Sequence, residues 1–278
     1  MVKLLVRILD IVLYSSLFTA CCATALCMAT ERLITSAVPA IVNDLHILVF
    51  GSTLLVYNTP RIVRKSQPSR SVARVASGWY FLFFFAGITM IAYGIIGQSR
   101  SVQLVSICLG AFAFAYFLPM LPFAQKKRLR DYGGVKIIVL AGVWTIATSI
   151  LPLLYWQKNI ADYPFEVLLR LTFIFTLCVI FDIRDIRADI SNRINTLPNK
   201  VGLRNSYMLI NVTLLLFAVL SVAQYFRHPS AGRLTGAILT ALITRAVVTY
   251  LRKRPSERAY FVLADGVMVL YSLLVLCM

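Results

Sequence analysis

Residues 165–189 read FEVLLRLTFIFTLCVIFDIRDIRAD, an apolar run that ends in a dense group of acids. The apolar part, residues 165–182, is about as long as a helix must be to cross a bilayer, roughly 17–25 residues. Asp182, Asp185 and Asp189 follow one another at intervals of three and four residues, so on a helix they share one face. The stretch therefore predicts a membrane-spanning helix that carries a stripe of three carboxylates at one end.

The composition of the whole chain agrees with a membrane protein. The 278 residues are 59% hydrophobic and only 14% charged, whereas a soluble domain carries about 25% charged residues. The apolar runs do not alternate with polar residues, which favours helices over the strands of a membrane barrel. We therefore expect an all-α membrane protein that forms a single membrane domain, residues 1–278.

The distribution of basic residues supports nine spans. With the N-terminus in the cytoplasm, 21 of the 28 Lys and Arg residues fall on the cytoplasmic side and 5 on the other side. This asymmetry is the positive-inside pattern, and it predicts a cytoplasmic N-terminus and an external C-terminus in a multi-pass protein of the cell (cytoplasmic or inner) membrane. It also accounts for the formal charge of +17, so no nucleic-acid partner is expected. The expected spans are 8–29, 38–57, 78–97, 101–119, 135–155, 165–182, 207–226, 231–251 and 259–278.

Two polar segments, 58–77 and 183–206, lie four predicted spans apart on the same side. Their spacing indicates two pseudo-halves of four helices each, about residues 1–130 and 131–258, followed by a ninth helix at 259–278.

The acidic stripe requires a positive partner. Three carboxylates on one helix face repel one another, and Mg²⁺ is well suited to join them because it takes a few carboxylates and completes its shell with water and phosphate oxygens. The simpler alternative is a solvated helix end, where the aspartates pair with Arg184 and Arg187 along the surface.

The residues after the stripe complete a longer pattern. Residues 182–202 read D-x-x-D-x-x-x-D, then Arg193, then Thr196-Leu197-Pro198, then Gly202. This pattern resembles the second aspartate-rich motif of the UbiA superfamily of intramembrane prenyltransferases. The resemblance extends to nine spans and to two long cytosolic segments.

The resemblance implies a fold and an activity. The fold would be a helical bundle with a central cavity open to the cytoplasmic side. The activity would be Mg²⁺-dependent transfer of a prenyl group from a prenyl diphosphate to an aromatic or lipid acceptor in the membrane. Asp182, Asp185 and Asp189 match the carboxylates that hold the metal and serve catalysis, while Arg193 and Lys200 would contact the diphosphate.

The chain departs from the superfamily at its other acidic motif, N-x-x-x-D-x-x-x-D. Asn58 matches the asparagine, but Ile62 and Ser66 occupy the acidic positions. Three interpretations remain open. In the first, basic side chains of this segment hold the diphosphate directly, since arginine grips phosphate bidentately. In the second, the protein is a non-catalytic member of the fold that binds a lipid or protein partner. In the third, the basic side chains only set topology and contact anionic lipid headgroups. The residues concerned are Asn58, Arg61, Arg64 and Lys65.

Two charges fall inside predicted spans. Arg245 and Asp265 are expected at matching depths, and charges within a bilayer tend to pair, so we predict a structural ion pair between them. Lys136 belongs to a basic segment, 126–136, that is predicted to be an ordinary positive-inside loop, with a basic lip beside the diphosphate as the alternative. A transporter is a weaker hypothesis, because the polar cluster lies at a span end rather than in the middle.

Overall fold

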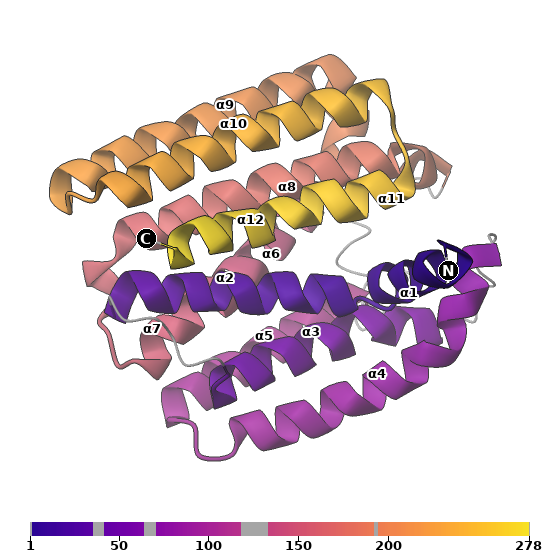
Figure 1. The fold of residues 1–278 in the computed structure, drawn as a ribbon, viewed down its shortest axis with the longest axis horizontal. Helices are drawn as coiled ribbons and strands as arrows, with labels where there is room; N and C mark the ends of the chain where they lie inside the picture. The colour runs from indigo at the N-terminus through magenta and orange to yellow at the C-terminus, as the bar shows by residue number, and fades with distance from the viewer. Residues whose placement is uncertain (1, 36–41, 64–70, 118–132, 192–193, 278) are drawn as a thin grey trace.

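The computed structural model describes residues 2–35, 42–63, 71–117, 133–191 and 194–277, and helices are the only regular structure in these ranges. Figure 1 shows long helices stacked side by side in a bundle. Two short π-helical turns, η2 and η4, and one 3-10 turn, η3, interrupt the α-helices. The elements are α1 (Val2–Tyr14), α2 (Leu17–Thr35), α3 (Asp44–Val63), α4 (Ser71–Ile95), α5 (Arg100–Phe117), α6 (Gly133–Thr145), η2 (Ile146–Ile150), α7 (Leu151–Tyr155), η3 (Ile160–Asp162), α8 (Pro164–Ser191), α9 (Leu197–Arg227), α10 (Ala231–Lys253), α11 (Glu257–Ala259), η4 (Tyr260–Ala264) and α12 (Asp265–Leu276).

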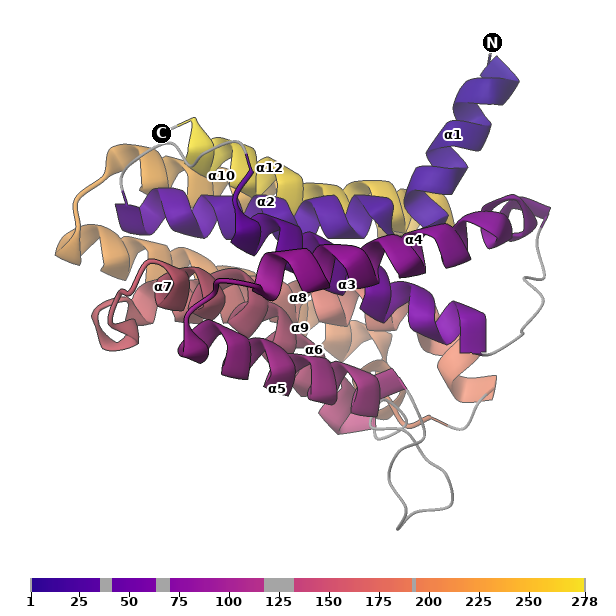
Figure 2. The same ribbon diagram turned by 90° about the horizontal axis from the view of Figure 1, so that it is seen from below.

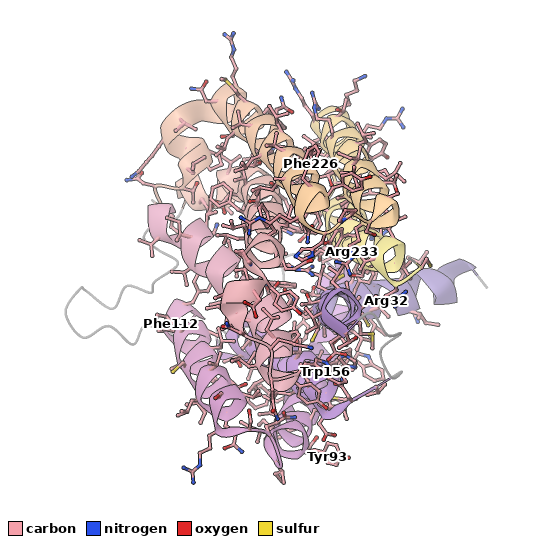
Figure 3. All side chains as sticks on the ribbon, turned by 90° about the vertical axis from the view of Figure 1, so that its left-hand side faces the viewer. Arg32, Tyr93, Phe112, Trp156, Phe226 and Arg233 are labelled. Atoms are coloured by element: carbon pink, nitrogen blue, oxygen red, sulfur yellow. The ribbon has the colours of Figure 1, made fainter. Side chains whose placement is uncertain are left out.

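Six helical segments of the described residues are long and apolar enough to cross a membrane. Two shorter apolar helices lie in α4 and α5. Large apolar side chains also cover the outside of the bundle; Tyr93 and Phe112 lie at its periphery in Figure 3 and are 62% and 57% exposed. The chain is thus a multi-pass α-helical membrane protein, while the count of nine spans and their orientation stay predictions. The six segments are Leu17–Thr35, Gly133–Tyr155, Pro164–Ser191, Leu197–Arg227, Ala231–Lys253 and Glu257–Leu276.

The first predicted span, 8–29, is not one helix. The chain breaks at Ser15 and Ser16, where Ser16 adopts a left-handed φ of 65°. Figure 2 shows α1 turning away from the bundle at this point, while α2 continues within it. The amide of Asn58 donates to the carbonyl oxygen of Ser15 at 3.0 Å, so a buried hydrogen bond from α3 holds the break in place. Hydropathy could not show this break, because both sides of it are apolar.

The π-helical turn η2 follows from a proline. Pro152 has no backbone N–H, so the carbonyl of Thr148, its partner in a regular α-helix, is left without a donor. The hydroxyl of Thr30 in α2 donates to this carbonyl at 2.6 Å. The irregular helix is therefore bonded to its neighbour inside the bundle, where an unpaired carbonyl is costly.

Helices α3 and α4 pack closely along a seam of glycines. A Cβ atom at Gly87 would lie 2.8 Å from the carbonyl oxygen of Gly51, and one at Gly94 would lie 2.8 Å from that of Asp44. Small residues let membrane helices approach, which strengthens van der Waals packing where lipid offers no hydrophobic driving force. The seam fixes α3, which carries Tyr57 and Arg61, against the rest of the bundle.

Helix α8 extends beyond its predicted end. The expected span stopped at residue 182, but the helix continues to Ser191, and α9 already begins at Leu197. The predicted polar segment 183–206 is therefore largely helical. Gly202 introduces a kink in α9 with a φ of 81°, a left-handed conformation that favours glycine.

Candidate functional site

The acidic stripe faces the interior of the bundle. Asp182, Asp185 and Asp189 line a cavity of about 420 Å³, and Asp182 and Asp189 are only 3% and 7% exposed. The cavity lies among α2, α3, α5, α6, α8, η4 and α12, so segments far apart in the sequence meet around it. The alternative of a solvated helix end is thus wrong for Asp182 and Asp189.

Lys136 places a cation against the first and the last acid of the stripe. Its Nζ atom lies 2.7 Å from Oδ1 of Asp182 and 3.1 Å from Oδ2 of Asp189. Lys136 was predicted to lie in a topology-setting loop, yet it lies within α6 and only 14% of its side chain is exposed. The signal was its position inside the expected span 135–155, because a charge within a span is rare and usually paired.

Glycine at the start of α6 brings Lys136 into position. A Cβ atom at Gly133 would lie 1.7 Å from the carbonyl oxygen of Asn195, so α6 begins in direct contact with the segment between α8 and α9. Lys136 follows within the first turn of α6. The absence of a side chain at Gly133 therefore allows the lysine to reach acids near the end of α8.

Arg184 also lines the cavity and pairs with an aspartate of the stripe, as the surface alternative expected of it. It grips the neighbouring Asp185 with two hydrogen bonds of 2.7 and 3.0 Å. Its guanidinium lies over the rings of Phe181 and Phe261, 4.8 and 5.1 Å from their centroids. The aromatic rings hold the guanidinium in the cavity by cation–π contact.

The residues predicted to hold a diphosphate divide into those that line the cavity and those that do not. Arg61 lines the cavity, donates to the carbonyl of Tyr14 and stacks 5.3 Å from the ring centroid of Tyr80. Asn58 is fully buried and does not line the cavity, because its amide bonds Ser15 and Leu54.

The other predicted ligands lie elsewhere. Lys200 is exposed on α9 and does not line the cavity. Arg64, Lys65 and Arg193 lie outside the described residues.

The predicted ion pair between Arg245 and Asp265 is wrong. The structure describes both residues and forms no ion pair between them. Arg245 is exposed and donates to the hydroxyl of Thr249 at 2.7 Å. Asp265 is buried, lines the same cavity as the stripe and accepts a hydrogen bond from Thr19. The expected match in depth did not bring them together, because Arg245 lies at the exposed surface of α10 while Asp265 faces the cavity.

A second cavity, of about 280 Å³, lies next to the charged one. Its walls are almost entirely apolar and come from α2, α3, α4, α5, α6, η2 and α7. Tyr57 and Trp144 line both cavities, and Nε1 of Trp144 donates to the Tyr57 hydroxyl at 3.0 Å. The two side chains thus form a shared wall between a charged compartment and an apolar one.

The acidic stripe retains capacity for a cation. Oδ2 of Asp182 is buried and has no hydrogen-bond partner among the described residues. A buried carboxylate oxygen without a donor is costly, and a divalent cation is a chemically suitable partner for it. The donor set therefore fits a hard cation, held by the carboxylates that Lys136 also contacts.

The fold and the site together define a class of protein: a polytopic membrane bundle with a charged cavity that adjoins an apolar one. No family model matches the sequence, and no curated protein matches it. Comparison with solved structures shows that the chain has the fold of the UbiA superfamily. This confirms the fold that its aspartate-rich motif indicated.

Three of these structures cover nearly all of the chain. A UbiA homologue from Archaeoglobus fulgidus, bound to GPP and Mg²⁺, matches over 97% of this chain and 100% of its own, with a TM-score of 0.64 and 10% identity. The same kind of homologue bound to Cd²⁺ gives a TM-score of 0.62 at 13% identity, with the same coverage. A digeranylgeranylglyceryl phosphate synthase matches over 98% and 99% of the two chains, with a TM-score of 0.55 and 13% identity.

Proposed function

We propose that this protein is a prenyltransferase, which transfers a prenyl group from a prenyl diphosphate to an aromatic or lipid acceptor in the membrane. The observation that carries the proposal is the shared wall of Tyr57 and Trp144 between the charged and the apolar cavity. Such a pair of compartments suits an amphiphile with a charged head and a hydrocarbon tail. A solved structure of the same fold is bound to GPP and Mg²⁺, which supports the choice of ligand.

The charged cavity contains both basic and acidic side chains that suit the diphosphate head of the donor. Arg61 and Lys136 offer N–H donors to the phosphate oxygens, and charge-assisted bonds of this kind are the strong ones. Asp182, Asp185 and Asp189 would hold Mg²⁺, which when bound neutralises charge on the leaving diphosphate. The chain's own contribution is to gather these groups around one cavity before the chemical step.

Aromatic rings surround the boundary where the reacting carbon would lie. Tyr57, Trp144, Phe181 and Phe261 all line the charged cavity. The faces of aromatic rings attract positive charge, which develops on the prenyl carbon as the bond to diphosphate breaks. The apolar walls also exclude water, which would otherwise compete with the acceptor.

A non-catalytic role in binding a lipid or a protein partner is the second candidate. The observation that favours it is the loss of acids in α3, where Ile62 stands at one of the two acidic positions of the superfamily's motif. In that case the two cavities would hold a phosphorylated lipid without cleaving it.

Consumption of a prenyl donor separates the two candidates. Proteoliposomes with the wild type are incubated with labelled geranyl diphosphate, a membrane lipid extract and Mg²⁺, and both released diphosphate and prenylated product are measured. We expect turnover that falls about 100-fold or more in Asp185→Ala and that stops when Mg²⁺ is chelated. The matched control is Asp162→Ala, at an exposed aspartate outside the cavity, which should retain activity. Donor that is bound but never consumed would reject the transferase in favour of the binding protein.

A further inference from the structure

The ammonium group of Lys136 occupies a position where a metal ion would be expected. It contacts Asp182 at 2.7 Å and Asp189 at 3.1 Å, and thereby bridges the two ends of the acidic stripe. We infer that Lys136 is a tethered cation that competes with a divalent metal for these two carboxylates, so that the metal binds together with the diphosphate rather than before it. This inference rests on the proposed function for the identity of the diphosphate ligand.

The occupancy of the carboxylate oxygens shows why competition is expected. Both oxygens of Asp185 are engaged by Arg184. A divalent cation would therefore reach Asp182, whose Oδ2 is buried and accepts no hydrogen bond from the described residues, and Asp189 more readily than Asp185. Lys136 already contacts both of these residues, so the metal and the ammonium would share the same ligands at short range.

The charge balance changes when a diphosphate arrives. Without it, an ammonium and a divalent cation on the same carboxylates repel each other, by an amount that is large at about 4 Å even with partial screening. A diphosphate brings several negative charges into the cavity and offers both cations a second partner. Lys136 can then turn from the carboxylates toward the phosphate oxygens, because a lysine side chain is a flexible stem with three rotatable donors.

Lys136 thus acts as a positioning residue with opposite effects on two ligands. It weakens binding of the metal alone, since it holds the metal's ligands. It strengthens binding of the diphosphate in the presence of metal, since it is released to neutralise the phosphate. A residue with a merely structural role would weaken both.

The test measures binding rather than turnover. Mn²⁺ is titrated into the purified protein in detergent, and the free ion is followed by electron paramagnetic resonance. We expect Lys136→Met to bind Mn²⁺ about tenfold or more tightly than the wild type. Lys136→Arg, which keeps the positive charge, should stay close to the wild type, and so should Lys200→Met, which removes an exposed lysine outside the cavity.

A second titration uses geranyl thiolodiphosphate, in which sulfur replaces the ester oxygen so that the donor resists cleavage. At a fixed concentration of Mn²⁺, we expect Lys136→Met to bind it about tenfold more weakly than the wild type. Adding Asp182→Asn to Lys136→Met should abolish the gain in Mn²⁺ affinity, which would locate the metal on the stripe.

Equal Mn²⁺ affinity in the wild type and in Lys136→Met would overturn the inference, and so would weaker binding of both ligands in the variant. Neither titration requires catalysis. A protein that binds a prenyl diphosphate without turnover can therefore still show the expected role of Lys136. Turnover without opposite effects of Lys136→Met on the two ligands would reject that role and leave the proposed function standing.

Discussion

Nζ of Lys136 lies 2.7 Å from Oδ1 of Asp182, so an ammonium group from α6 neutralises the first acid of the stripe on α8. The two residues come from different predicted spans and meet at the wall of the same cavity. The contact links the position of α6 to the charge state of the site. The strength of this link can be measured without knowing the substrate.

A double-mutant cycle tests the Lys136–Asp182 pair. Lys136→Met leaves Asp182 buried without its cation, and breaking a buried pair in this way costs about 3–5 kcal/mol. The double variant Lys136→Met, Asp182→Asn should be more stable than the sum of the single changes by about 1–3 kcal/mol. Unfolding in detergent without divalent cations measures each term. The distant Asp162→Asn serves as control and should add to Lys136→Met without coupling, and simple additivity with Asp182→Asn would contradict the pair.

The start of α6 offers a matched pair of glycines. Gly133→Ala would place a Cβ atom 1.7 Å from the carbonyl oxygen of Asn195, whereas Gly134→Ala meets nothing within 4 Å. We expect Gly133→Ala to lower the free energy of unfolding by about 1–3 kcal/mol, because the helix must shift. Gly134→Ala should leave it unchanged or raise it by up to about 1 kcal/mol, because alanine favours helix. Thermal unfolding of the two variants gives the comparison, and equal effects would show that the contact is not tight.

The glycine seam between α3 and α4 is tested in the same way. A Cβ atom at Gly87 would lie 2.8 Å from the carbonyl oxygen of Gly51 and 3.0 Å from the amide nitrogen of Leu55. Gly87→Ala should therefore destabilise the bundle by about 1–3 kcal/mol. Gly110→Ala, in α5, meets nothing within 4 Å and should have no such cost. Retention of wild-type stability in Gly87→Ala would mean that the two helices can separate freely.

Two arginines within the membrane-spanning helices have contrasting surroundings. Arg170 is 3% exposed and donates to the carbonyl of Leu26 and to the hydroxyls of Thr30 and Ser149. Arg170→Gln replaces five N–H donors by two on a shorter side chain, so acceptors in this group lose their donor, at a cost of about 1–3 kcal/mol for a buried unsatisfied group. Arg245 is exposed, so Arg245→Gln should change stability by less than about 0.5 kcal/mol. A loss of stability in Arg245→Gln as large as that in Arg170→Gln would argue against the described placement of the two side chains.

Several parts of the site were predictable from local sequence. The intervals among Asp182, Asp185 and Asp189 place them on one helix face, because a helix repeats every 3.6 residues. Arg61 was likewise predicted close to the site and lines the charged cavity. The length and apolarity of the runs predicted most of the spanning helices, because a bilayer requires each segment to satisfy its own backbone.

Other parts depended on contacts between distant segments. The break at Ser16 is held by Asn58 from another helix, and hydropathy does not detect it. The pairing of Arg245 with Asp265 was inferred from depth alone, but depth does not specify which way a side chain points around its helix axis.

The chain's composition and the spacing of its acids therefore fixed a helical membrane bundle with a carboxylate stripe, since both depend only on neighbours along one helix. Two acids of that stripe pair with Lys136, which is brought to them by the close approach of Gly133 to Asn195. Helix packing makes that contact between residues far apart in sequence, and it depends on shape and side-chain direction across several helices, which no single segment encodes.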